Sequence, residues 1–160
     1  MQIRPIQPSD NLALAKIVRD TLTEFGANHP GTVYYDATTD ALFELFRQPL
    51  SAYFVALTDE GKIVGGGGLF PTEGLPEDTV ELVKMYLLPE VRGKGLGGRI
   101  IEKCQETAKA FGFKRIYIES MPELKLALRV YERFGFSYLE APMGRGGHFG
   151  CKLWMLKEIN

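Results

Sequence analysis

The chain has few cysteines and no long apolar run. Its two cysteines, Cys104 and Cys151, stand far apart without metal-ligand spacing, so the sequence predicts neither a structural disulfide nor a metal site. No apolar stretch approaches the ~20 residues that a membrane-spanning helix needs. The N-terminal run Met1-Gln-Ile-Arg-Pro5 lacks the apolar core of a signal peptide. We therefore expect a cytoplasmic protein without a membrane partner.

An excess of charge of one sign is also absent. Nineteen lysines and arginines stand against 20 aspartates and glutamates, and no basic run interrupts the sequence. This balance argues against a nucleic-acid partner. A length of 160 residues with 45% hydrophobic and 24% charged residues is typical of one globular domain, which we place at residues 1–160. Glycine, in contrast, is abundant, with 18 residues.

Apolar periodicity and turn residues predict strands that alternate with four helices. The first helix opens at Pro8 with Ser9 as its N-cap, and the second covers about Thr39 to Gln48. The third follows a glycine-rich loop and ends at Gly112, and the fourth runs from Pro122 to Gly135. Strands are expected at 2–6, 52–58, 62–70, 80–87, 115–119, 136–139 and 151–159. The order predicts an α+β domain with a mixed sheet and helices on its faces.

The glycine-rich loop lies where the 80–87 strand gives way to the third helix. Gly93, Gly95, Gly97 and Gly98 lack Cβ atoms where the backbone must turn tightly, and Arg92 and Lys94 add positive charge. The following helix directs its unpaired N–H groups and the positive end of its dipole at this loop. These features predict a phosphate site, and hence a phosphorylated cofactor.

Two nucleotide-binding motifs compete for the loop. Gly93-Lys-Gly-Leu-Gly-Gly98 fits the dinucleotide pattern G-x-G-x-x-G, with Glu119 placed as a ribose-binding acid. However, Pro89 to Arg92 separate the loop from its strand, and residues 52–88 have the pattern of an antiparallel meander. A P-loop requires a hydroxyl residue after its lysine, whereas Gly95 follows Lys94.

A third pattern accounts for more of the chain. Arg92-Gly-Lys-Gly-Leu-Gly97 matches the Q/R-x-x-G-x-G/A loop of the GCN5-related N-acetyltransferase (GNAT) superfamily. Met85-Tyr-Leu-Leu-Pro-Glu90 and Tyr131-Glu-Arg-Phe-Gly-Phe136 resemble its L-x-V-x-P-E and Y-E-x-x-G-F signatures. The resemblance covers nearly the whole chain. It implies a GNAT fold, whose central mixed sheet is mostly antiparallel, and direct acetyl transfer from acetyl-CoA to a primary amine, without a metal.

The resemblance also implies which residues hold acetyl-CoA. Its pyrophosphate would lie on the backbone amides of the loop, from Arg92 through Gly93, Lys94, Gly95, Leu96 and Gly97 to Gly98. Its pantetheine arm would follow the strand at Met85, Tyr86 and Leu87. Relatives often carry an asparagine seven residues before the tyrosine, where this chain has Leu124. Either another polar group such as Ser120 replaces it, or backbone groups alone hold the arm.

Tyr131 is the candidate acid that protonates the departing thiolate, and it would also contact the cofactor. The candidate bases are Glu81 on the strand before the loop, Glu119, and His148 in a glycine-rich loop near the C-terminus. The segment Phe25 to Asp36, rich in aromatic and polar groups, would help to shape the acceptor site.

The acceptor would be an amine of a small molecule or a peptide, and both a monomer and a homodimer are compatible with the sequence. The alternative function is a non-catalytic module that binds or senses acyl-CoA.

Overall fold

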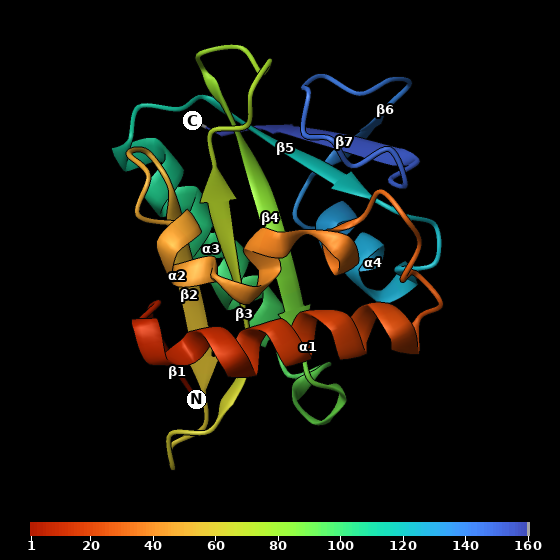
Figure 1. Ribbon diagram of the computed structural model, residues 1–160. Helices are drawn as coiled ribbons and strands as arrows, with labels where there is room; N and C mark the ends of the chain where they lie inside the picture. Colours follow the sequence, from red (N-terminus) through yellow and green to blue (C-terminus); the bar gives the residue numbers. More distant parts are fainter. Residues whose placement is uncertain (160) are drawn as a thin grey trace.

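The computed structural model describes residues 1–159 and contains one seven-stranded sheet (Figure 1). Every neighbouring pair is antiparallel except β4 and β5, which are parallel. This arrangement confirms the expected α+β class. The strand order across the sheet is β1 (Gln2–Pro5), β2 (Ala52–Leu57), β3 (Ile63–Phe70), β4 (Thr79–Leu87), β5 (Arg115–Ser120), β7 (Leu153–Glu158) and β6 (Ser137–Leu139).

Four α-helices flank the sheet: α1 (Asn11–Glu24), α2 (Leu42–Leu45), α3 (Leu96–Ala110) and α4 (Lys125–Arg133). Along β2, Phe54 and Ala56 pack with α3, whereas the alternate residues Tyr53 and Val55 pack with α1 and α2. Because successive strand residues point to opposite faces, α3 lies on one face and α1 with α2 on the other (Figure 1). None of the helices in residues 1–159 is long and apolar enough to cross a membrane.

The sheet opens in its middle, between β4 and β5. Their parallel pairing covers only Thr79 to Glu81 on β4, opposite Arg115 to Tyr117 on β5. β4 continues to Leu87 along β3, with an irregularity opposite Gly66–Gly68 that includes Lys84 at φ +52°. The Tyr53 hydroxyl donates a 2.7 Å hydrogen bond to the Lys84 carbonyl and holds this bulge in place. The far part of β4 therefore presents an edge that β5 does not cover.

Glycines in β3 let neighbouring groups approach the sheet closely. A Cβ atom on Gly67 would lie 2.9 Å from Ile100 of α3 and 3.0 Å from Met85 of β4. A Cβ atom on Gly66 would lie 2.6 Å from the ring of Tyr53, the residue that fixes the bulge. Side chains at these positions would push α3 and the bulge away from their observed places.

The predicted helix from Thr39 to Gln48 is wrong. The segment forms a 3₁₀ turn (Ala37–Asp40) followed by the single turn of α2. The Thr39 hydroxyl donates to the Val33 carbonyl at 2.6 Å, and Asp40 pairs with Arg19 of α1. Asn11 of α1 then accepts the Phe43 N–H at 2.8 Å. These contacts with distant residues break the periodic helix into two pieces.

The start of the first helix is also corrected. Ser9 lies inside a 3₁₀ turn (Pro8–Asp10) and forms no cap, while Asp10 accepts the Gln7 N–H at 2.8 Å. Asp10 is in addition bound by Arg4 at 2.7 Å, which accounts for its burial. The fourth helix begins at Lys125 rather than Pro122.

Candidate active site

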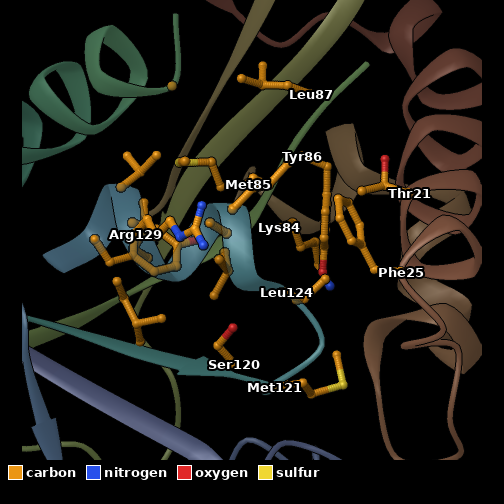
Figure 2. Close-up of a pocket in the computed structure, with 18 of the residues that line it drawn as sticks. Thr21, Phe25, Lys84, Met85, Tyr86, Leu87, Ser120, Met121, Leu124 and Arg129 are labelled. Atoms are coloured by element: carbon orange, nitrogen blue, oxygen red, sulfur yellow. The ribbon is translucent and has the colours of Figure 1, made fainter. Parts of the chain in front are cut away.

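A cavity of about 610 Å³ occupies the opening between β4 and β5 (Figure 2). Its walls come from the exposed edge of β4, the end of β5, the start of α3, one face of α4 and the C-terminal part of α1. The cavity brings together residues that the sequence separates widely, including Glu81, Met85, Tyr86, Leu87, Ser120, Tyr131 and His148.

The glycine-rich loop forms one end of this cavity. Gly93 and Gly95 have φ angles of +74° and +81°, which side chains disfavour, and Gly95 is the N-cap of α3. The Arg99 N–H bonds to the Gly95 carbonyl, so the N–H groups of residues 96–98 precede the first turn's hydrogen bond. Gly97 and Gly98 line the cavity with Gly93 and Gly95. The helix end therefore presents backbone donors suited to an anion.

The charged side chains of the loop, unlike its backbone N–H groups, do not point to an anion site. Arg92 binds Glu24 of α1 through two hydrogen bonds of 2.7 and 2.9 Å, donates to the Leu87 carbonyl and lies over the ring of Phe25. It thereby fixes the loop against α1 and β4. Lys94 is exposed and outside the cavity wall.

Two further features of this end differ from the expectations drawn from the sequence. The Leu96 side chain packs in the core, so only its backbone could face the cavity. Arg129 and Arg133 of α4 line the cavity, although the sequence analysis did not select them. Their spacing of four places them on one helix face with the potential to meet a phosphorylated ligand.

The middle of the cavity lies along the uncovered edge of β4. Met85, Tyr86 and Leu87 face it from β4, and Ser120, which is buried, faces it from the end of β5. Tyr131 of α4 is also buried, and its ring meets Phe136 edge-on at 6.0 Å between centroids. Burial raises the pKa of Tyr131, which keeps the phenol protonated.

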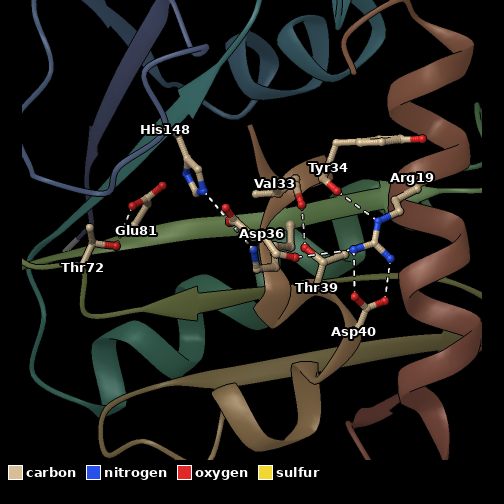
Figure 3. A network of polar contacts seen from close by, with 10 residues as sticks. Arg19, Val33, Tyr34, Asp36, Thr39, Asp40, Thr72, Glu81 and His148 are labelled. Atoms are coloured by element: carbon tan, nitrogen blue, oxygen red, sulfur yellow. Dashed lines mark hydrogen bonds and ion pairs between the residues drawn. The ribbon is translucent and has the colours of Figure 1, made fainter. Parts of the chain in front are cut away.

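Glu81 lies at the opposite end, where the pairing of β4 with β5 stops (Figure 3). It is only 5% exposed, and the Thr72 hydroxyl donates to its Oε1 at 2.6 Å. Burial raises its pKa to about 7, with a smaller contribution from the charge of Glu119. The Thr72 hydrogen bond and the charges of His148 and Lys84 oppose this shift. A carboxyl group with such a pKa can exchange a proton near neutral pH.

His148 and Asp36 lie beside Glu81 (Figure 3). Lys84 contacts Asp36 and completes this charged group. His148 Nε2 lies 2.6 Å from Asp36 Oδ2, and Lys84 Nζ lies 3.7 Å from the same oxygen. The hydrogen bond to Asp36 raises the pKa of His148, whereas burial lowers the pKa of Lys84. Lys84 stands in the apolar run of a strand, so its sequence context does not indicate a site residue.

The residues in and next to the expected acceptor segment, Phe25 to Asp36, contact different parts of the protein. Asp36 faces the site, but Glu24, just before the segment, binds Arg92. His29 contacts Glu123 at the surface. Thus only part of this segment meets the cavity.

Cys151 lines the main cavity, a position that its sequence context did not indicate. Burial raises the pKa of its thiol to about 12, so the reactive thiolate is scarce at neutral pH. Cys104 is buried in the core, where burial raises its pKa to about 12 as well.

A second cavity of about 250 Å³ adjoins the first at Glu81, Val83, Lys84 and His148. Its lining also includes the apolar side chains of Leu45, Phe46 and Phe70 and the charged side chains of Glu73 and Arg145. The two cavities thus meet beside the group whose pKa is near neutral.

Comparisons with known proteins agree with this geometry. Residues 14–136 match the model of the acetyltransferase (GNAT) family. An uncharacterized N-acetyltransferase of Escherichia coli K12, YjgM, is 39% identical over 98% of this chain and 94% of its own. The chain belongs to the GNAT family. The family and the names of its homologues indicate that this GNAT enzyme is an N-acetyltransferase.

Two other proteins extend the comparison. The spermine/spermidine N(1)-acetyltransferase of Bacillus subtilis is 32% identical to this GNAT enzyme over 58% of the chain and 61% of its own length. The structure of YncA from Salmonella typhimurium with its cofactor acetyl-CoA has a TM-score of 0.74 and 23% identity, and covers 100% of this chain and 94% of that one.

The dinucleotide interpretation is wrong, because β4 and β5 are the one parallel pair in residues 1–159 and a doubly wound sheet requires several.

Proposed function

We propose that this GNAT enzyme transfers the acetyl group of acetyl-CoA to a primary amine of a small molecule or peptide, within a ternary complex. The observation that carries the proposal is one cavity that joins a helix N-terminus, an uncovered strand edge, a buried tyrosine and a carboxyl group with a pKa of about 7. The helix N-terminus and the strand edge suit binding of the cofactor, and the tyrosine and the carboxyl group suit the proton transfers of the reaction.

The cofactor would bind along the cavity from α3 to Glu81. The N–H groups of residues 96–98 would meet the pyrophosphate, with Arg129 and Arg133 as nearby positive charges. The uncovered edge of β4 at residues 85–87 would pair with the amide-rich arm as an added strand does. Ser120 could contact the arm from the facing strand.

The chemistry would lie where the two strands part. As the amine nitrogen bonds to the thioester carbonyl carbon, Glu81 accepts the proton that the nitrogen loses. A backbone N–H of β4 stabilises the negative charge that develops on the carbonyl oxygen. When the carbon–sulfur bond breaks, Tyr131 donates a proton to the sulfur and regains one from solvent.

His148 is the less suitable base of the candidates. Its ring nitrogen is engaged by Asp36, and its raised pKa favours the imidazolium form. We assign it to holding Asp36 and Lys84 in place. The raised pKa of Cys151 supports direct attack by the amine over an acetylated cysteine.

Calorimetric titration with acetyl-CoA, with NAD as the control, tests the cofactor assignment. We expect micromolar binding of acetyl-CoA and none of NAD; the reverse result would overturn the cofactor assignment. A panel of amines, followed by free-thiol release, then tests the transfer. Intersecting initial-rate lines are expected for a ternary complex, and parallel lines would exclude it. Absence of thiol release with every amine would favour the alternative of an acyl-CoA-binding module.

A further inference from the structure

A pair of carboxyl groups stands where the two cavities meet. Glu119 lines the main cavity, and Glu81 lines both. The Tyr117 hydroxyl donates to Glu119 Oε2 at 2.8 Å, but Glu119 Oε1 is buried and has no hydrogen-bond partner in the described part of the chain. A buried carboxylate oxygen without a donor is costly, so this atom indicates a place for a ligand that donates a hydrogen bond.

Gly146 leaves open the space that these two carboxyl groups face. A Cβ atom on Gly146 would lie 3.4 Å from Glu119 Oε1 and 3.9 Å from Glu81 Oε1. Gly146 itself lines the second cavity. Oxygen atoms of two different strands therefore converge on one small space, and that space exists because residue 146 has no side chain.

The cations nearby are engaged by other carboxylates. His148 bonds to Asp36 at 2.6 Å, and Lys84 lies 3.7 Å from the same oxygen. Arg145, at the end of the second cavity, lies 3.4 Å from Glu73. The carboxyl pair therefore calls for one positive charge from a ligand, while the rest of the second cavity already contains cations.

Part of the lining of the second cavity is apolar. Leu45, Phe46, Phe70 and Val83 supply this part. A hydrocarbon chain can bury its surface against this part. A second ammonium group in this cavity would instead find its carboxylates already paired, Asp36 with His148 and Lys84, and Glu73 with Arg145.

From these contacts we infer that the acceptor is a small monoamine on an apolar arm. Its ammonium group binds between Glu81 and Glu119 over Gly146, and its arm lies in the second cavity. The inference rests on the proposed function and specifies its substrate class. Glu119 then holds the ammonium, and Glu81 first takes one proton from it, which leaves the amine nitrogen with the lone pair that attacks the thioester carbon. Glu81 passes this proton to solvent and then accepts the second proton, which the nitrogen loses as the amide forms and the carbon–sulfur bond breaks.

A matched pair of amines tests the charge requirement. 1-Aminopentane and 1,5-diaminopentane share a five-carbon chain and differ in a second ammonium group at the far end. We expect kcat/KM for the monoamine to exceed that for the diamine by about tenfold or more, because the second charge loses its hydration and finds the carboxylates of the second cavity already paired. Equal values, or a preference for the diamine, would overturn the inference.

Two variants test the position of the ammonium group. Gly146→Ala should raise KM for 1-aminopentane by about tenfold or more, since the methyl group fills the space between the carboxyl groups. The matched control is Gly144→Ala in the same loop, whose Cβ atom would meet Leu75 rather than the carboxyl pair. Both variants should bind acetyl-CoA as the parent does.

Glu119→Gln removes the charge and keeps an acceptor for Tyr117. It should also raise KM for 1-aminopentane without weakening acetyl-CoA binding. An unchanged KM in both Gly146→Ala and Glu119→Gln would overturn the inference. If neither five-carbon amine reacts but another class of amine releases thiol, the inference fails while the proposed function stands. If no amine releases thiol, the proposed function fails.

Discussion

The two ends of the main cavity are built in different ways. At the proposed cofactor end, residues 92–98 lie next to one another in sequence, and the groups proposed to bind are mostly their backbone N–H groups. At the proposed acceptor end, where the second cavity adjoins, Asp36, Glu81, Glu119 and the loop that carries Gly146 and His148 come from four separate segments, and the polar groups there are mostly side chains.

This difference separates what each end can recognise. A helix N-terminus binds phosphate whatever the neighbouring side chains are, so one short loop can serve many relatives. Side chains from separate loops can change one at a time without disturbing that loop. Under the proposed function, the cofactor end would therefore identify the reaction, and the acceptor end would determine which amine reacts.

The largest expected effect is the loss of acetyl-CoA affinity when the cofactor end is altered. Gly95→Glu places a side chain at φ +81° and a negative charge where the phosphate groups would bind. Acetyl-CoA affinity should fall by about 10³-fold, because charge repulsion adds to the lost backbone geometry. Calorimetric titration measures the loss.

Gly112→Glu is the matched control for this change. Gly112 has φ +91° at the other end of α3, and open space surrounds it as it does Gly95. Both variants carry backbone strain and should lose thermal stability, but Gly112→Glu should retain acetyl-CoA binding. Retention of binding by Gly95→Glu would refute the cofactor site.

The second prediction concerns Glu81 and the stability of the acceptor end. The pKa of this carboxyl is about 7 in the fold, against 4.5 without the fold's influence. Between these values the folded protein holds a proton that the unfolded chain releases, so the stability should fall as the pH rises through this window. Above pH 7 the full cost of ionising a buried carboxyl is present.

Glu81→Gln removes this cost and keeps an acceptor for Thr72. At pH 8 the variant should be more stable than the parent by about 3 kcal/mol, with little difference near pH 4. Urea unfolding at both pH values measures this change, and turnover should fall in the same variant. Glu73→Gln, at an exposed carboxyl of the same region, should show neither effect. Equal stability of Glu81→Gln and the parent at pH 8 would show that Glu81 is not held in a buried, proton-retaining state.

The same contrast explains what sequence reasoning could predict. The order of helices and strands along the chain and the glycine-rich loop follow from local patterns in contiguous residues. The opening between β4 and β5 depends on how separate segments pair, which such patterns do not give. The Asp36–His148 contact joins residues 112 positions apart, and no local pattern indicates it. Lys84 has the sequence context of an ordinary strand residue, and its position depends on a hydrogen bond from Tyr53.

The failed helix at residues 39–48 has the same cause. Its apolar spacing is helical, yet contacts of Thr39, Asp40 and Phe43 with other segments decide its conformation. Local patterns also do not predict the burial of Glu81, because the elements packed around this residue bury it and thereby raise its pKa. Sequence patterns thus predict the glycine-rich loop and the start of α3 well, and the group of side chains around Glu81 only in part.

The third prediction separates binding from chemistry at the middle of the cavity. Tyr131→Phe removes the proposed acid and leaves the ring's contact with Phe136 in place. We expect kcat to fall by about 30-fold, since loss of a positioned acid slows the departure of the thiolate. The affinity for acetyl-CoA should stay within about twofold of the parent, since backbone groups contribute most of the binding.

Tyr138→Phe is the control for this variant, because Tyr138 is exposed and bonds only to Glu132. Its kcat should match that of the parent. Turnover of Tyr131→Phe at the parental rate would remove Tyr131 from the chemistry and leave it as a core residue of α4.

The smallest expected effect is that of Cys151→Ala. Cys151 lines the cavity, but burial raises the pKa of its thiol to about 12, which leaves only about 10⁻⁵ of it as thiolate at pH 7. If the amine attacks the thioester directly, kcat for the variant should stay within about threefold of the parent, because no covalent bond to sulfur is needed. An acetylated cysteine would instead require this sulfur, so that its removal would abolish turnover. A burst of free CoA from the parent before any amine is added would also contradict direct attack. The variant and the burst experiment therefore decide whether both ends of the cavity must be occupied at once, as a ternary complex requires.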